Sequence, residues 1–189
     1  MGSLSDRVDD AATTLVCAPS TGSENRCPGF MSAATGHTMW VTYSRSPSAC
    51  IEEYRATATA ESESLSVIAV GDMATVESPP DDVTVESVSA PEDLTGLGIT
   101  LSQLLSDHEQ ATVCFDSLTV LLQYVDHETA YEFLNAVTGH LYAADASAHF
   151  HLDPTAHERR EIDALASLFD AIAEWDDGEW SVRKRKLLQ

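Results

Sequence analysis

Short strand-like runs recur along the chain, several of them apolar and rich in β-branched residues, and polar or helix-like segments separate them. The runs cover residues 13–18, 37–43, 64–70, 84–88, 112–115 and 147–152. Runs of this length, bounded by Pro, Gly, Asn or Asp, are typical of strands that are buried on both faces. The pattern therefore predicts six strands of a mainly parallel sheet.

Helical signals fall between these runs. Ser46-Pro47 combines an N-cap residue with proline at the first helical position, and a short helix is expected at 99–105. Apolar residues from 130 to 144 follow helical spacing. Thr155-x-x-Glu158 has the form of a capping box, opening a helix whose apolar face is Ile162, Leu165 and Phe169. Residues 168–175 and 179–185, on either side of Asp176-Asp177-Gly178, fit a C-terminal hairpin.

Alternating strands and helices predict a three-layer α/β fold with a mainly parallel sheet. We expect one domain over residues 13–189 after a lead-in at 1–12, since neither a repeat nor a linker divides the chain. Ligands of such sheets bind beyond the carboxyl ends of the strands. Those ends are predicted at 18–25, 44–45, 116–117 and 153.

The strong excess of acidic residues disfavours binding of this chain to anionic macromolecules and membranes. The chain carries 31 acidic and 10 basic residues, a net charge of −21, and its lysines are Lys184 and Lys186. Between Arg55 and Arg159 there are 18 acids and no Lys or Arg. Nucleic acids and anionic membranes would be repelled, so neither is an expected partner. The acid excess resembles that of proteins from salt-accumulating haloarchaea and predicts a solvent rich in K⁺ and hydrated cations.

Location and redox state are inferred from what the sequence lacks. No apolar run reaches the roughly 18–20 residues of a membrane span, and the first residues do not resemble a signal peptide. The cysteines Cys17, Cys27, Cys50 and Cys114 form no CxxC pair. We expect a reduced cytoplasmic protein in which Cys17 and Cys114 are small buried side chains.

Several strand ends together resemble one known family. The segments that carry the likeness are Cys114-Phe115-Asp116-Ser117-Leu118-Thr119, Tyr131-x-Phe133-Leu134, His151-Leu152-Asp153-Pro154, Leu168-Phe169-Asp170 and Tyr43 through Pro47. In this order they resemble the RecA/KaiC-like P-loop ATPases, particularly haloarchaeal KaiC-like proteins, over about residues 13–185. The resemblance implies that Asp116 is the Walker B acid, which organises Mg²⁺, and that the fold is RecA-like.

The phosphate-binding loop that the resemblance implies is degenerate. A working loop reads G-x-x-x-x-G-K-[ST], and its glycines, lysine and hydroxyl hold the phosphates and Mg²⁺. In the corresponding stretch, which includes Gly22, Ala18 and Ser23 replace the two glycines, Glu24 replaces the lysine and Asn25 the hydroxyl residue. Arg26 is the only nearby cation.

The resemblance also implies one or two glutamates after the second strand, where they polarise the attacking water. Ser44 and Arg45 occupy those positions, and neither is a general base at neutral pH. Asp116 would then organise Mg²⁺ without a phosphate cradle opposite it. Alternatively, Asp116 and Ser117 are inherited structural elements, with Ser117 capping the next helix.

Two further clusters have a structural and a functional interpretation. His149, His151, Asp153 and His157 gather near one strand end and would either pack as polar residues or bind a metal, which we do not expect. Arg183, Lys184, Arg185 and Lys186 would either protect an edge strand from aggregation or contact an acidic partner, including another copy of the chain.

Together these patterns predict a catalytically inactive RecA/KaiC-like domain without a cofactor. Its expected role is regulatory or signalling, through a protein partner or paralogue, with self-association as one form of that pairing. The alternative is an atypical nucleotide-binding protein that holds Mg·ATP through Arg26, Arg45 and Asp116, without hydrolysis or with hydrolysis assisted by a neighbouring subunit.

Overall fold

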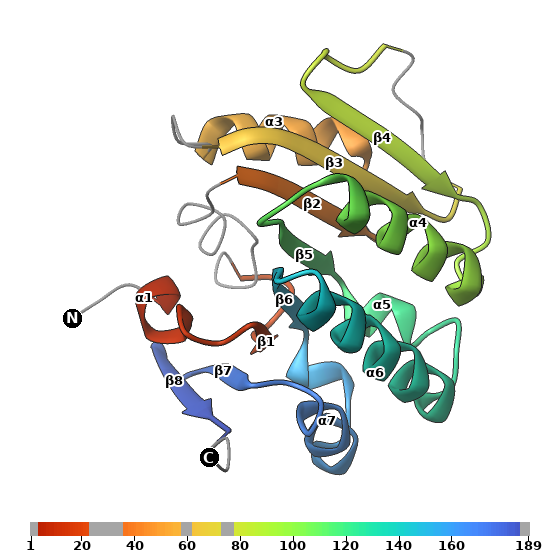
Figure 1. Cartoon of the computed structure of the whole chain (residues 1–189). Coiled ribbons are helices and arrows are strands. Elements are labelled where there is room, and N and C mark those ends of the chain that lie inside the picture. Colours follow the sequence, from red (N-terminus) through yellow and green to blue (C-terminus); the bar gives the residue numbers. More distant parts are fainter. Residues whose placement is uncertain (1–3, 23–35, 58–61, 73–77, 186–189) are drawn as a thin grey trace.

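Eight strands form a single sheet in the order β4-β3-β2-β5-β6-β1-β7-β8 (Figure 1). This computed structural model describes residues 4–22, 36–57, 62–72 and 78–185. The strands are β1 (Thr13–Cys17), β2 (Gly36–Thr42), β3 (Ser62–Val70), β4 (Val83–Val88), β5 (Thr112–Asp116), β6 (Ser147–Leu152), β7 (Ala171–Asp176) and β8 (Glu179–Lys184). Neighbouring strands pair in parallel except β7 and β8, which are antiparallel. The mainly parallel sheet and the C-terminal hairpin are thereby confirmed.

Helices cover both faces of this sheet. They are α1 (Leu4–Val8), α3 (Pro47–Thr57), α4 (Leu94–Asp107), α5 (Leu118–Leu121), α6 (His127–Ala143) and α7 (Arg159–Ala166), with a 3₁₀ turn, η1 (Pro154–Ala156), before α7. Helices α4 to α7 lie on one side of the sheet, and α1 and α3 lie on the other (Figure 1). The fold is therefore the predicted three-layer α/β arrangement.

The main core lies between the sheet and the α4–α7 layer. Phe150 on β6 is fully buried, and its ring lies between those of Phe115 and Phe169, with centroids 5.4 and 5.0 Å away. Across the sheet, Trp40 packs with residues of α3, including Ile51 and Tyr54. Burial on both faces explains why central strands such as β1 and β5 form compact apolar runs in the sequence, whereas β4 and β8 carry exposed positions.

Two helix predictions need correction. Helix α4 begins at Leu94 rather than Ile99, because the Asp93 side chain accepts the Gly96 N–H at 2.8 Å and caps an earlier turn. The capping box before α7 is formed by Glu158 and Glu161. Thr155 instead donates to Asp153, so the chain makes a 3₁₀ turn where the sequence predicted the helix start.

The ends of the described chain pack together. Helix α1 falls within the expected lead-in and buries Val8 against Val16 of β1. At the other end, Asp177 and Gly178 have φ of 47° and 87°, which fits a tight hairpin turn. Trp175 and Trp180 pair across that turn, with centroids 5.3 Å apart.

The cysteines differ in state. Cys17 and Cys50 are buried free thiols, and burial raises the pKa of each to about 12. Cys114 is buried as predicted but is disulfide-bonded, so the expected free thiol is not found there. Cys27 lies outside the described residues. None of the described helices is both long and apolar enough to cross a bilayer.

Candidate functional site

The predicted strand ends meet at one edge of the sheet. Thr42 of β2 is in register with Asp116 of β5, and Cys17 of β1 is in register with Leu152 of β6. The parallel register therefore places the residues that follow these strands beside one another. They are Arg45, Asp116, Asp153 and the loop that begins at Ala18, and we refer to this region as the carboxyl edge.

Asp116 is largely buried at this edge and has two polar neighbours. Ser44 Oγ donates to Asp116 Oδ2 at 3.3 Å, and Arg45 Nε lies 3.6 Å from the same oxygen. Burial raises the pKa of Asp116, while Arg45 and Ser44 act in the opposite direction. The Asp116–Ser117 peptide bond is cis, and Ser117 Oγ accepts the Val120 N–H at 3.2 Å, so Ser117 is the predicted helix cap.

Arg45 stands where the resemblance implies a catalytic glutamate, and it pairs with two carboxylates. One is Asp116, and the other is Glu53 of α3, which contacts Arg45 Nη1. The guanidinium carbon lies 6.0 Å from the Trp40 ring centroid. The Arg45 backbone is fixed as well, because its N–H donates to Thr42 Oγ1 at 2.9 Å. A positively charged side chain thus occupies the position beside Asp116.

The loop after β1 uses its described polar groups within the protein. The Ala18 N–H donates to the Leu152 carbonyl at 3.1 Å, and the Gly22 N–H donates to the Pro19 carbonyl at 3.1 Å. Ser20 donates to Asp153 Oδ2 through both its N–H, at 2.9 Å, and its hydroxyl, at 2.5 Å. The remaining predicted loop positions, Ser23, Glu24, Asn25 and Arg26, lie outside the described residues.

Asp153 is the acceptor that organises this corner. Its second oxygen accepts the N–H and hydroxyl of Thr155 at 2.9 and 2.6 Å. Burial acts to raise the pKa of Asp153, but the hydrogen bonds from Ser20 and Thr155 lower it to about 2. Asp153 is therefore a carboxylate at neutral pH, and it lies next to the loop that follows β1.

An open depression of about 650 Å³ lies over the Arg45 corner. It is lined by Ser44, Arg45, Ser46, Ala49, Glu52 and Glu53. One cation and two carboxylates face it, and Asp116 adds a third carboxylate behind Arg45. This electrostatic environment is unfavourable for a polyanionic phosphate chain.

The four residues of the predicted histidine cluster do not form one group: His149 and His151 lie together, and Asp153 and His157 each have other neighbours. His149 and His151 are buried on one face of β6, with ring centroids 5.2 Å apart, and their donor atoms lie within 4.8 Å of Cys114 Sγ and of each other. Burial lowers the pKa of His151 to about 3, with Arg45 contributing in the same direction. Asp153 faces Ser20 and Thr155 instead, so it belongs to no metal-ligand group in the described part of the chain.

His157 has different neighbours from the other members of that cluster. Its ring nitrogen Nε2 lies 3.1 Å from Thr119 Oγ1, and its donor atoms group with those of His127 and Glu161. Neither His127 nor Glu161 was predicted as a site residue, because His127 lies 30 residues from His157 and no local spacing signals the contact. The contacts of Ser20 with Asp153, of Thr119 with His157 and of Glu53 with Arg45 were not predicted either, because they depend on tertiary structure.

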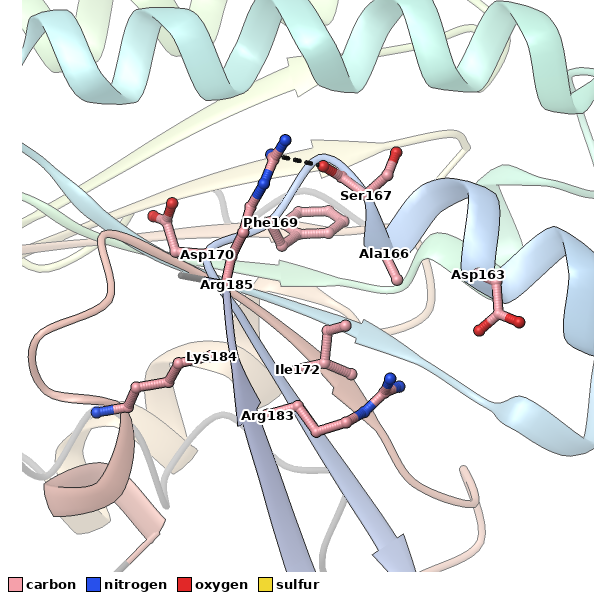
Figure 2. Close-up of a pocket in the computed structure, with 9 residues that line it drawn as sticks. All are labelled: Asp163, Ala166, Ser167, Phe169, Asp170, Ile172, Arg183, Lys184 and Arg185. Atoms are coloured by element: carbon pink, nitrogen blue, oxygen red, sulfur yellow. Dashed lines mark hydrogen bonds between the residues drawn. The ribbon is translucent and has the colours of Figure 1, made fainter. Parts of the chain in front are cut away.

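The basic strand β8 is engaged within its own chain. Arg183 pairs with Glu174 at 3.1 Å, Lys184 with Asp10, and Arg185 donates to the Ser167 carbonyl at 2.9 Å. Figure 2 shows Arg183 and Lys184 pointing to opposite sides of the strand, with Arg185 extending past Phe169 toward Ser167. Arg183, Lys184 and Arg185 line one side of a pocket of about 510 Å³. Lys186 lies outside the described residues.

Sheet order and carboxyl-edge geometry define a three-layer α/β protein consistent with the Rossmann and RecA-like folds. The chain belongs to DUF7504, a family of unknown function, whose model matches residues 11–175. No curated protein matches it significantly. A solved structure from Pyrococcus horikoshii OT3, Project ID PH0250, is similar with a TM-score of 0.60 at 15% identity, covering 97% of this chain and 93% of that chain. At this identity the likeness concerns the fold alone.

Proposed function

We propose that this protein is a non-hydrolysing RecA/KaiC-like domain that acts as a regulatory or signalling module through protein–protein contacts. The observation that carries the proposal is the position of Arg45 between Asp116 and Glu53. In a working site, the Walker B acid organises Mg²⁺ opposite the phosphates. Here a side-chain cation already neutralises that acid, and it stands where the activating glutamate would be.

The loop after β1 supports the same proposal. A phosphate-binding loop presents backbone N–H groups to an anion. Ser20 instead directs its N–H and its hydroxyl to the Asp153 carboxylate. An incoming phosphate would have to displace this carboxylate and would be repelled by it. Of the groups that could serve Mg·ATP in the described part of the loop and on β5, Ser20 and Asp116 are thus already paired inside the protein.

Exposed apolar side chains on the α4–α6 side offer contact area for a partner. Ile99, Tyr124, Tyr131 and Tyr142 are exposed in the structure. Tyrosine is enriched in protein interfaces because its ring buries area while its hydroxyl stays hydrogen-bonded. The surrounding acidic surface fits a partner that associates in concentrated salt, where charge repulsion is screened. A paralogue or a second copy of the chain meets this requirement.

Titration calorimetry with Mg·ATP tests the proposal. The purified chain would be titrated in about 2–3 M KCl, where the Debye length falls below about 3 Å. We expect no binding heat up to millimolar nucleotide. Light scattering coupled to size exclusion, followed by pull-downs at the same salt concentration, would then identify the oligomer or the partner.

Micromolar binding of Mg·ATP would refute the proposal and favour the alternative of an atypical nucleotide-binding protein. The partial exposure of Arg45 at the depression gives that alternative a physical basis. In that case Arg45→Ala should abolish the heat, because the variant lacks the described cation nearest to Asp116. Arg160→Ala is the matched control, since Arg160 is exposed on α7 and pairs with Glu158.

A further inference from the structure

Three metal-binding side chains meet at the amino ends of α6 and α7. His127 is the first residue of α6, Glu161 lies in the first turn of α7, and His157 directly follows η1. One donor atom from each side chain lies within 4.8 Å of the other two. The three residues come from two separate parts of the chain, so the grouping is a product of the fold.

The carboxylate of this group is held in a fixed orientation. Glu161 Oε2 accepts the Glu158 N–H at 2.9 Å, as one half of the capping box that begins α7. The other oxygen, Oε1, lies 3.1 Å from His127 Nε2. The helix cap therefore directs one carboxylate oxygen at the histidine.

His157 has the outer contact that metal-binding histidines commonly make. A histidine that binds a metal through one ring nitrogen usually donates the other N–H to an oxygen. Thr119 Oγ1 lies 3.1 Å from His157 Nε2 and is itself held by the Asp153 N–H at 2.8 Å. This contact fixes the imidazole plane and leaves Nδ1 for a ligand role.

The protein's own groups do not fully satisfy His127. Its Nδ1 is buried and has no hydrogen-bond partner within the described ranges. An imidazolium in an ion pair with Glu161 would need an acceptor for both of its N–H groups. The contact with Glu161 through Nε2 therefore leaves Nδ1 of His127 buried and unsatisfied within the described part of the chain.

A pocket of about 590 Å³ adjoins the group. His127 and Glu161 line it together with Tyr131, Glu128, Glu132 and Arg160. The glutamates outnumber Arg160, so the lining keeps a net negative charge that favours a cation. An ion held by three protein ligands would keep a coordination position for water or for a ligand that enters from the pocket.

We propose that His127, His157 and Glu161 form a three-ligand Zn²⁺ site. Two imidazole nitrogens and one carboxylate oxygen match a zinc centre that keeps one open position, whereas Mg²⁺ and Ca²⁺ prefer oxygen ligands alone. Ligand atoms of a tetrahedral zinc centre are about 3.4 Å apart, so the side chains close by roughly an ångström on binding. The site is separate from the carboxyl-edge residues Arg45 and Asp116, and it does not depend on the proposed function.

Zinc titration of metal-free protein tests this assignment. The untagged chain, purified without nickel and treated with a chelator, would be titrated with ZnCl₂ against a competing chelator dye. We expect one high-affinity Zn²⁺ per chain and no displacement by excess Mg²⁺. His127→Ala and His157→Ala should each weaken binding at least about tenfold. His140→Ala is the matched control, because His140 lies on the same helix and bonds Ser102 instead.

Glu161→Gln separates metal binding from folding. Glutamine at this position can still accept the Glu158 N–H, so the capping box and α7 remain while the charged ligand is lost. We expect an unchanged circular dichroism spectrum without zinc and an affinity loss of about tenfold or more. Co²⁺ bound in place of zinc should show visible ligand-field bands without a thiolate charge-transfer band. Absence of binding, unchanged affinity in all three variants, or a thiolate charge-transfer band from a cysteine ligand would overturn the assignment.

Discussion

Removing Arg45 should lower the free energy of unfolding, because the carboxylates at the carboxyl edge would lose their neutralising cation. Arg45→Ala leaves Asp116 and Glu53 without their shared cation. Breaking a fully buried ion pair costs about 3–5 kcal/mol, because the remaining charge stays buried without a partner. Here the exposed side-chain fractions are 30% for Arg45, 16% for Glu53 and 17% for Asp116. Solvent reaches all three groups, so we expect a smaller loss of about 2–3 kcal/mol.

The expected loss of about 2–3 kcal/mol includes the contact of Arg45 with the Trp40 ring. A partly solvated cation over an aromatic ring contributes about 0.5–1 kcal/mol. For a chain of this length, each kcal/mol lowers Tm by about 2–4 °C. Thermal and urea unfolding in about 2–3 M KCl would measure the change. We expect the loss to persist in concentrated salt, because partly buried pairs are screened less than exposed ones.

The loss should also depend on pH with a defined sign. Burial raises the pKa of Asp116, and Arg45 opposes that rise. In Arg45→Ala the folded-state pKa rises further above the unfolded value of about 3.9. The folded state then binds the proton more tightly than the unfolded state, so the destabilisation is present at neutral pH and is relieved as the pH falls toward about 4.

Two comparisons make this prediction refutable. Arg160→Ala, which removes a largely exposed ion pair with Glu158, should change the free energy of unfolding by less than about 0.5 kcal/mol. The double variant Arg45→Ala/Asp116→Ala should be less destabilised than the sum of its single changes by about 1–2 kcal/mol. If the single changes add without coupling, or if Arg160→Ala costs as much as Arg45→Ala, the neutralising role of Arg45 is refuted.

Two further predictions concern the neighbouring corner and the core. Asp153→Asn should lower stability at neutral pH by about 2 kcal/mol, because the folded-state pKa of Asp153 is about 2 and the bonds from Ser20 and Thr155 favour its charged form. This contribution is present above the unfolded pKa and is lost as the pH falls through about 2. Chemical denaturation between pH 7 and pH 2 should therefore show the unfolding free energies of the wild type and the variant converging. A constant difference between them at all pH values would contradict the prediction. Phe150→Ala should cost about 3–5 kcal/mol in urea unfolding, since the ring is fully buried between two other phenylalanines. The exposed Ile99→Ala should cost under about 1 kcal/mol, and equal losses would contradict the assigned core.

The strands could be predicted because burial on both faces leaves a local signal. Residues 13–18 were predicted as a buried apolar strand, and β1 covers Thr13–Cys17 with every residue buried. Helix α4 was only partly predicted, since Gly96 and Gly98 lower the helix propensity of its first turns. The burial of Leu97 and Leu101 against the sheet compensates for that low propensity, and such burial is a tertiary effect.

For the candidate site, the positions of residues along the chain could be predicted, but their contacts with distant segments could not. The positions of Arg45 and Asp116 followed from the order of strand ends along the chain. The pairing of Arg45 with Glu53 could not be predicted, because it depends on how α3 packs against the sheet. The contacts between Ser20 and Asp153 and between His127 and Glu161 likewise join segments that are distant in sequence.

The ion pairs of Arg45 with Asp116 and Glu53 bear on how such a domain could carry information. Nucleotide-driven switches change shape because a bound phosphate and its metal ion appear and disappear with each cycle of hydrolysis. If the domain binds no nucleotide, as proposed, its own cation gives it one electrostatic state whatever the cellular level of ATP. Any partner would therefore respond to how many copies of the domain are present, and the timing of the response would be set by synthesis and degradation.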